Sequence, residues 1–122
     1  MINKQKLYSI ALVSAAMILM LVSTAGTEPY AYISNYGNLG IVSVINTTTN
    51  TVIPTVNVGS YPYGFAVTPD GSNVDVTNSK STSFSTVSII DTTTNNVTAT
   101  LKVGNCPNVV AATADGTNVY VS

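Results

Sequence analysis

A repeat of 45 residues runs through this chain and constrains its fold more than any other feature. Segment 41–74, set against 86–119 without gaps, gives 18 identities in 34 pairs. The most similar stretches are NTTTN at 46–50 with DTTTN at 91–95, and TPDGSNV at 68–74 with TADGTNV at 113–119. Self-similarity at such a period indicates an array of equivalent supersecondary units that bury their apolar faces against one another.

Each unit contains four short strands separated by polar turns. Apolar and polar residues alternate with the period of a strand, which predicts strands at 63–68, 73–78, 86–91 and 96–102. The same comparison predicts the last three strands of a preceding unit at 30–34, 40–46 and 51–57, and the first two strands of a following unit at 108–112 and 118–122. Four strands per repeat of this length are typical of a β-propeller blade. We therefore expect an all-β partial β-propeller over 27–122, with roughly two four-stranded antiparallel blades.

The strand at 51–58 has features of a sheet edge. Pro54 has no N–H to donate to a ladder, so this strand should lie outermost in its blade. Strict alternation places Val52, Pro54, Val56 and Val58 on one face of the strand.

Two Asp-Gly pairs are predicted to be turn residues rather than ligands. Asp70 and Gly71 recur as Asp115 and Gly116, 45 positions later. Asp can hydrogen-bond to its own backbone in a turn, and Gly can adopt a positive φ.

The first 26 residues are predicted to be a signal peptide or an N-terminal membrane anchor, formed by a hydrophobic helix. Lys4 and Lys6 precede an apolar stretch at 7–22, and small residues follow. Ala25 occupies a position at which signal peptidase would cleave. The alternative is an uncleaved anchor, because the apolar stretch is close to the length that spans a bilayer. Both alternatives place residues 27–122 outside the cytoplasm, either secreted or at the cell surface.

The composition argues against several functions. The chain has no His, one Cys, no Trp and a net charge of -1, with only 7% charged residues. His is the commonest general base and metal ligand, so we predict no catalytic residue, no metal site and no cofactor. Nucleic-acid binding requires clustered Lys or Arg, which is missing here, so nucleic acid is not an expected partner. We therefore expect a protein that binds rather than an enzyme.

Two N-x-S/T motifs are candidate N-glycosylation sites. They begin at Asn46 and Asn96, and both fall at polar hairpins, where a glycan has room. Tyr61 and Tyr63, in the loop 59–64, could present aromatic surface to a ligand, but core or rim packing is their expected role.

At these residues the sequence resembles the YVTN family of β-propeller repeats, found in archaeal surface-layer proteins and in exported bacterial proteins. The resemblance covers about 30–122 and is carried by YISN at 32–35, DVTN at 75–78, YVS at 120–122, VGSYPYG at 58–64 and TPDG at 68–71. It implies an exported structural or adhesive module of the cell surface, a glycoprotein whose partners are other blades, copies of the same chain, or a cell-surface protein or glycan. The alternative is a fragment of an enzymatic or redox propeller, lactonase-like or cofactor-binding.

Two features qualify this resemblance. Asp75 stands where the family has Tyr, on a strand face that normally packs between blades. A closed propeller needs about four to eight blades, and this repeat count gives little more than two. We therefore expect a truncated gene product, a ring completed by several copies, or a unit stacked on another propeller.

Overall fold

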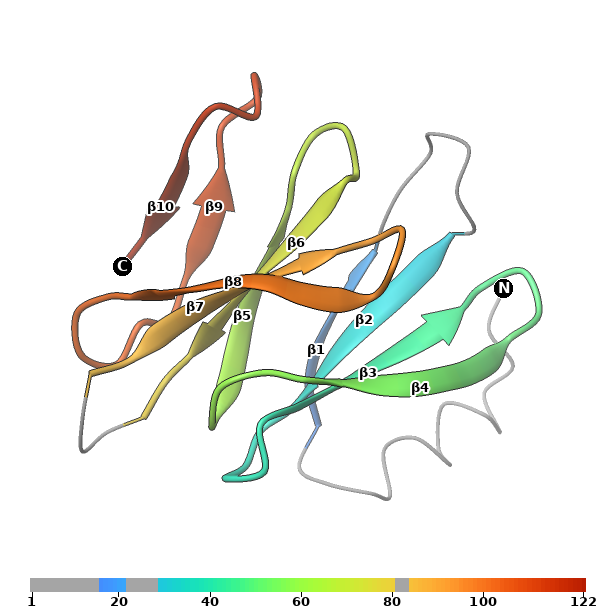
Figure 1. The fold of residues 1–122 in the computed structure, drawn as a ribbon, viewed down its shortest axis with the longest axis horizontal. Helices are drawn as coiled ribbons and strands as arrows, with labels where there is room; N and C mark the ends of the chain where they lie inside the picture. Colours follow the sequence, from blue (N-terminus) through green and yellow to red (C-terminus); the bar gives the residue numbers. More distant parts are fainter. Residues whose placement is uncertain (1–15, 22–28, 81–83) are drawn as a thin grey trace.

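The computed structural model describes residues 16–21, 29–80 and 84–122, and in these ranges every regular element is a β-strand. The strands form three antiparallel sheets that lie side by side (Figure 1). The predicted all-β fold with antiparallel four-stranded sheets is therefore confirmed.

The first two sheets are complete four-stranded meanders in which each strand pairs with the next along the chain. Blade 1 consists of β1 (Ala16–Leu21), β2 (Tyr30–Asn35), β3 (Ile41–Asn46) and β4 (Thr51–Asn57). Blade 2 consists of β5 (Pro62–Val67), β6 (Asn73–Asn78), β7 (Thr86–Asp91) and β8 (Asn96–Lys102). The third sheet has two strands, β9 (Val110–Ala112) and β10 (Val119–Val121).

The N-terminal segment contributes a strand rather than the predicted helix to the described part of the chain. Met20 of β1 pairs with Tyr32 of β2, and Ala66 of β5 pairs with Asp75 of β6. Because Tyr32 and Asp75 are equivalent positions of the two blades, β1 pairs with β2 in the same register as β5 with β6. A strand at this place supplies partners for the backbone N–H and C=O groups along the β2 edge. Among the described residues no helix is long and apolar enough to cross a membrane. The rest of the predicted signal or anchor segment, including Ala25, lies outside the described residues.

The main core lies between blades 1 and 2. Alternate residues of both blades form one buried cluster, which includes Tyr32, Val42, Val44 and Val56 from blade 1 and Val74, Val76 and Ile90 from blade 2. The side chains between these positions along each strand point to the opposite face of the same sheet. Blade 2 therefore covers one face of blade 1, and its own second face is turned toward β9 and β10 (Figure 1).

β4 is the edge strand of blade 1, as Pro54 predicts. The predicted face is correct for Val56 and Val58, which pack on the core, and wrong for Val52 and Pro54, which are exposed. The pairing of β3 with β4 shifts by one residue between Val42 and Val44, which marks a β-bulge. A bulge reverses the alternation of side chains on either side of it. Ile53 and Val56 consequently pack on the core, whereas Val52 is 51% exposed.

The 45-residue repeat is preserved in unusual backbone conformations. Asn50 and Asn95 both have φ of 54°, and Tyr61 and Cys106 have φ of 57° and 52°. Positive φ is uncommon for residues other than Gly, so its recurrence at equivalent positions shows that blades 1 and 2 end in the same turn geometry.

Candidate functional site

The connections between strands lie at the two ends of the blades. One end, the turn end, carries the turns 47–50, 68–72, 92–95 and 113–117, and the other, the loop end, carries the loops 36–40, 58–61 and 103–109. The predicted turn and glycosylation residues in the described part of the chain belong to the turn end, whereas the candidate aromatic residues Tyr61 and Tyr63 lie at the loop end.

Asp70 organises the turn between β5 and β6. Its Oδ1 accepts hydrogen bonds from the Thr68 hydroxyl (2.7 Å), the Ser72 backbone N–H (3.0 Å) and the Ser72 hydroxyl (2.8 Å). Gly71 follows with a φ of 72°. The Ser72 N–H and the two hydroxyls together lower the pKa of Asp70 to about 2, because each donor stabilises the carboxylate.

Asp115 repeats this arrangement between β9 and β10. Its Oδ1 accepts from the Thr113 hydroxyl (2.5 Å), the Thr117 N–H (3.1 Å) and the Thr117 hydroxyl (2.8 Å), and Gly116 has a φ of 72°. The Thr113 hydroxyl, followed by the Thr117 donors, lowers the pKa of Asp115 to about 2. In both turns, Oδ1 of the carboxylate accepts all three of these bonds from donors of its own turn.

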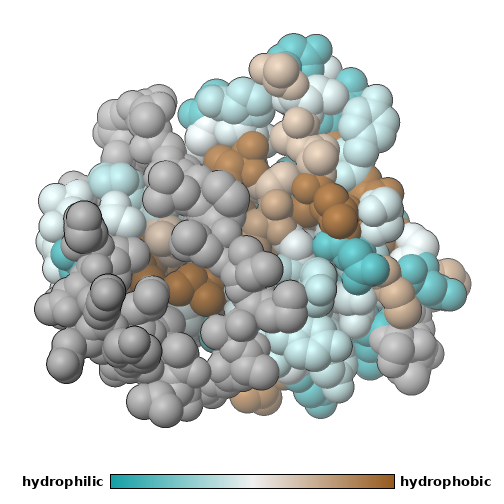
Figure 2. Space-filling view, turned by 180° about the vertical axis from the view of Figure 1, so that it is seen from behind, coloured by the Kyte–Doolittle hydropathy of each residue, from teal (hydrophilic) through white to brown (hydrophobic). Residues whose placement is uncertain are grey.

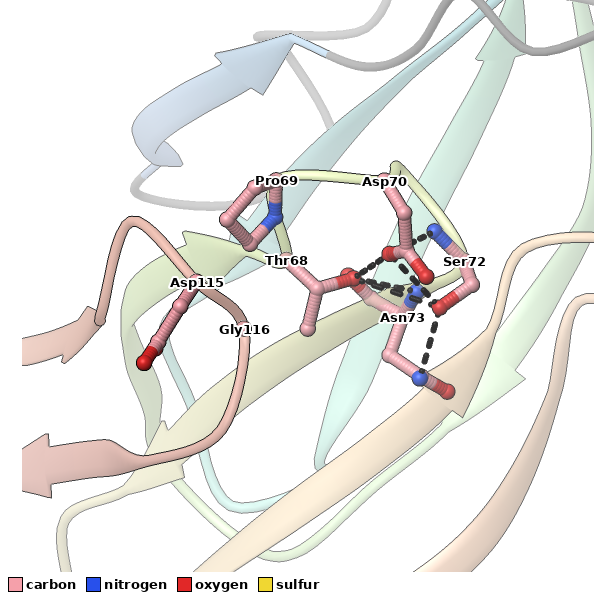
Figure 3. Close-up of a pocket in the computed structure, with 7 residues that line it drawn as sticks. All are labelled: Thr68, Pro69, Asp70, Ser72, Asn73, Asp115 and Gly116. Atoms are coloured by element: carbon pink, nitrogen blue, oxygen red, sulfur yellow. Dashed lines mark hydrogen bonds between the residues drawn. The ribbon is translucent and has the colours of Figure 1, made fainter.

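The two Asp-Gly turns enclose a cavity of about 240 Å³, shown in Figure 3. The carboxylate of Asp70 is directed into its own turn, and the side chain of Asp115 extends away from it (Figure 3). No group of three or more His, Cys, Asp or Glu side chains lies within metal-binding reach in the described ranges. The cavity therefore reflects the spacing of two turns, and the paired acidic residues do not converge on a cation.

The two candidate glycosylation residues also lie at the turn end. Asn46 ends β3, and its Oδ1 accepts from the backbone N–H groups of Thr48 (2.9 Å) and Thr49 (3.1 Å). Asn96 begins β8 with an exposed side chain whose Nδ2 donates to the Thr94 carbonyl (3.2 Å). Asn96 is thus the more exposed of the two residues.

Three tyrosines cluster at the loop end. The ring of Tyr36, from the β2–β3 loop, lies 5.4 Å from the ring of Tyr61 and 6.1 Å from the ring of Tyr63 between centroids. These spacings are typical of interacting aromatic pairs. Blade 1 and blade 2 therefore share one aromatic surface, here called the tyrosine cluster (Tyr36, Tyr61 and Tyr63).

Backbone hydrogen bonds hold the two loops of the tyrosine cluster together. The Tyr61 N–H donates to the Gly37 carbonyl (2.8 Å), and the Val58 N–H donates to the Gly40 carbonyl (2.7 Å). Gly40 has a φ of 63°, and a Cβ there would lie 2.6 Å from the Val58 carbonyl oxygen. Only glycine therefore fits at this position.

A cavity of about 310 Å³ adjoins the tyrosine cluster. Apolar side chains of Tyr36, Leu39 and Ile41 line it together with the polar residues Asn35, Ser43 and Thr55. Leu39 is 83% exposed at its rim. A concave, largely apolar site with a few polar groups is the usual form of a small-ligand site, and it shares Tyr36 with the tyrosine cluster.

The sequence pattern identifies two members of this cluster but not the third. Tyr61 and Tyr63 are adjacent to a recognisable turn, whereas Tyr36 comes from a loop in the other blade. In the sequence, Tyr36 stands out only as an aromatic residue in a short loop that contains Gly and Asn. Its contact with Tyr61 arises from the packing of blade 1 on blade 2, which the local sequence does not show.

The chain is similar to known proteins at the level of its fold. No protein-family model matches the chain, and no curated protein matches it significantly. Among solved structures, a chain titled Kuenenia stuttgartiensis hydrazine synthase is similar, with 31% identity and a TM-score of 0.68, over 76% of this chain and 25% of that one.

Two further structures are similar in fold at lower identity. The Dos1 propeller gives a TM-score of 0.75 at 15% identity, over 88% of this chain and 29% of that one. A functionally unknown protein from Desulfotomaculum acetoxidans gives a TM-score of 0.71 at 19% identity, over 88% of this chain and 34% of that one. The chain thus spans about a quarter to a third of the length of these structures. Together with the side-by-side antiparallel sheets, this similarity shows that the chain has the β-propeller fold.

Proposed function

We propose that this chain is an exported structural or adhesive β-propeller repeat module of the YVTN type, which binds at the cell surface through loops at its blade ends. The observation that carries the proposal is the tyrosine cluster at the loop end, beside a cavity of about 310 Å³. Tyrosine rings provide rigid, amphipathic contact area at a low cost in conformational entropy. Their hydroxyls remain available to a polar ligand such as a glycan.

The N-terminal sequence supports the extracytoplasmic location in this proposal. Lys4 and Lys6 ahead of the apolar stretch 7–22 direct export. Cleavage after Ala25 then removes β1 (Ala16–Leu21), so blade 1 of the exported chain begins with β2. The alternative of an uncleaved anchor leads to the same side of the membrane. Glycosylation at Asn96, which is an exposed residue, and at Asn46 belongs to the same proposal.

The proposal is tested by binding of the purified chain to an array of immobilised glucose, mannose and N-acetylglucosamine oligomers, and to cell envelopes of the source organism. Tyr36→Ala and Tyr61→Ala should each weaken binding at least tenfold. Tyr120→Ala removes an exposed tyrosine from β10 and is the matched control, which should bind as the wild type does. Equal binding by all four proteins would overturn the assignment of the tyrosine cluster.

A second candidate function is that of a fragment of an enzymatic or redox propeller, lactonase-like or cofactor-binding. The identity of 31% with the hydrazine synthase chain favours it. The chain has no His to serve as a general base or metal ligand. Absorption spectra and metal analysis of the chain isolated from its native host separate the two functions, because a stoichiometric chromophore or metal would favour the enzymatic one.

A further inference from the structure

Positive and negative charges occupy opposite ends of the molecule. Lys80, which follows β6, and Lys102, which ends β8, are both exposed at the loop end (Figure 1). The carboxylates at the turn end are those of Asp70, Asp91 and Asp115. The loop-end connections 36–40, 58–61, 79–85 and 103–109 contain no Asp or Glu. In the described part of the chain, the exposed charges of the loop end are therefore both positive.

Lys102 lies beside an exposed aromatic ring. Its Nζ is 5.7 Å from the centroid of the Phe84 ring, which is a cation–π distance. Phe84 is 74% exposed, and Lys102 is exposed as well. The ring thus positions the ammonium group at the surface, where its N–H donors remain available to a negatively charged group.

Backbone hydrogen bonds connect the segment of Lys80 to the tyrosine cluster. The Tyr61 carbonyl accepts from the Ser79 N–H (2.9 Å), while the Tyr61 N–H donates to the Gly37 carbonyl (2.8 Å). On the other side of Lys80, the Ser85 hydroxyl donates to the Lys80 carbonyl (3.2 Å). Tyrosine rings and a cation are therefore held on one ordered surface, which lowers the entropic cost of binding a ligand.

Exposed apolar side chains extend this surface over both blades. Leu39 of blade 1 and Phe84 of blade 2 stand 45 residues apart, at the same position of the repeat, and are 83% and 74% exposed. The rear view in Figure 2 likewise shows hydrophobic residues at the surface beside polar ones. The loop end thus combines apolar and aromatic contact area with positive charge.

This combination fits a sugar ring that carries a carboxylate. Tyrosine has an apolar ring and a polar hydroxyl, so it can contact both the C–H face and the hydroxyls of a sugar. A carboxylate on the sugar would pair with a lysine in a charge-assisted hydrogen bond. A lipid bilayer fits less well, because insertion of Phe84 would carry the Lys102 ammonium toward the hydrocarbon. Two separate lysines are also too few for the phosphates of a nucleic acid.

We propose that the loop end binds an acidic polysaccharide that contains uronic acids. The tyrosine cluster contacts the sugar rings, and Lys80 and Lys102 pair with their carboxylates. This inference rests on the proposed function, since it names the chemical class of the glycan that the same surface binds.

The experiment compares two ligands that differ only in charge, oligogalacturonate and the same oligomer fully methyl-esterified. Each is titrated calorimetrically into the purified wild-type chain and into Lys80→Gln, Lys102→Gln and Thr48→Glu. Thr48 is exposed at the turn end, so Thr48→Glu is the control that changes the net charge equally but at the opposite end. A six-residue strand such as β6 separates the two ends by about 20 Å. This is about twice the screening length in 0.1 M salt.

The wild-type chain should bind the acid about fivefold more tightly than the ester in 0.1 M salt, and less selectively at higher salt. Lys80→Gln and Lys102→Gln should each weaken binding of the acid and leave binding of the ester unchanged. Thr48→Glu should keep the wild-type preference.

Equal affinities for acid and ester, a preference that survives in both lysine variants, or no binding of the acid would each overturn the proposal. Tighter binding to phosphatidylglycerol vesicles than to the acid, weakened by the same lysine variants, would overturn it in favour of a membrane surface. Binding of neutral sugars on the glycan array tests the proposed function without any contribution from a carboxylate, so the two failures are distinguishable.

Discussion

The hydroxyl of Tyr32 in blade 1 donates a hydrogen bond to the side-chain oxygen of Asn95 in blade 2, across 63 residues of sequence. Asn95 has a φ of 54°, and the ring of Tyr32 lies within the buried cluster that joins the two sheets. This bond adds direction to a buried cluster that is itself apolar and non-directional, and the Ser34 hydroxyl adds a second polar bond between the blades by donating to the Tyr63 carbonyl (3.3 Å). Burial raises the pKa of the Tyr32 hydroxyl well above its ordinary value, so it remains a donor at neutral pH.

Tyr32→Phe should lower the free energy of unfolding by about 1–2 kcal/mol, because it leaves the Asn95 oxygen without its partner while the ring is retained. Urea unfolding followed by tyrosine fluorescence measures the change. Tyr30→Phe is the matched control, since the Tyr30 ring packs edge-on against Tyr32 at 6.5 Å in the same region. An equal loss in both variants would contradict a specific role for the Tyr32 hydroxyl.

Asp75→Asn should stabilise the chain at neutral pH by about 1–3 kcal/mol, because it removes a buried carboxylate. Burial raises the pKa of Asp75 above its unfolded value, so its contribution to stability is fully present below about pH 4 and is lost as the pH rises through the folded pKa. The gain from the substitution should therefore shrink as the pH is lowered from 7 to 3. Urea midpoints of both proteins across this range measure it, and a gain that does not depend on pH would refute the explanation.

Gly40→Ala should cost at least about 1–2 kcal/mol, since a left-handed conformation is unfavourable for residues with a Cβ, and the new Cβ meets the Val58 carbonyl. It should also weaken glycan binding, because it separates the two loops that hold the tyrosine cluster. Gly37→Ala, in the same loop, meets nothing within 4 Å and should change stability by less than about 0.5 kcal/mol. The same thermal midpoint for both variants would count against this account of the loop.

Asp70→Asn and Asp115→Asn should reduce the sensitivity of the chain to acid. The pKa of each carboxyl is lowered to about 2 by its turn donors. Each carboxylate therefore contributes stability above about pH 4, which is lost as the pH falls toward 2. In thermal scans, the double variant should be less stable than the wild type at pH 6 and should lose less on acidification. A parallel loss in both proteins would show that other groups control the acid transition.

The period of the sequence predicts most of the fold, because each blade repeats the same turns and the same strand spacing. The predicted strands 73–78, 86–91 and 96–102 coincide with β6, β7 and β8, and the edge position of β4 follows from Pro54. The sequence does not predict which face of β4 each side chain occupies. The β-bulge in the pairing of β3 with β4 exchanges the faces of Val52 and Ile53, and this bulge depends on how the two strands pair. Period alone carries no information on such a register shift.

The candidate site is predicted less completely than the fold. Tyr61 and Tyr63 are visible beside a turn motif, but Tyr36 joins them only through the packing of two blades. In a similar way, the sequence marks Asp75 as a departure from the repeat, whereas its unpartnered Oδ2 is seen only once the neighbouring sheets are in place. Contacts between blades combine residues far apart in the chain, and a local pattern does not encode them.

The central claim, that the chain is an exported binding module, is tested most directly by the mass and location of the chain in producing cells. Intact mass spectrometry of the cytoplasmic and extracytoplasmic fractions should find the chain outside the cytoplasm, with an N-terminus directly after Ala25. External protease should degrade it in intact cells. Recovery of the full 122-residue chain from the cytoplasm, protected from external protease, would contradict the account.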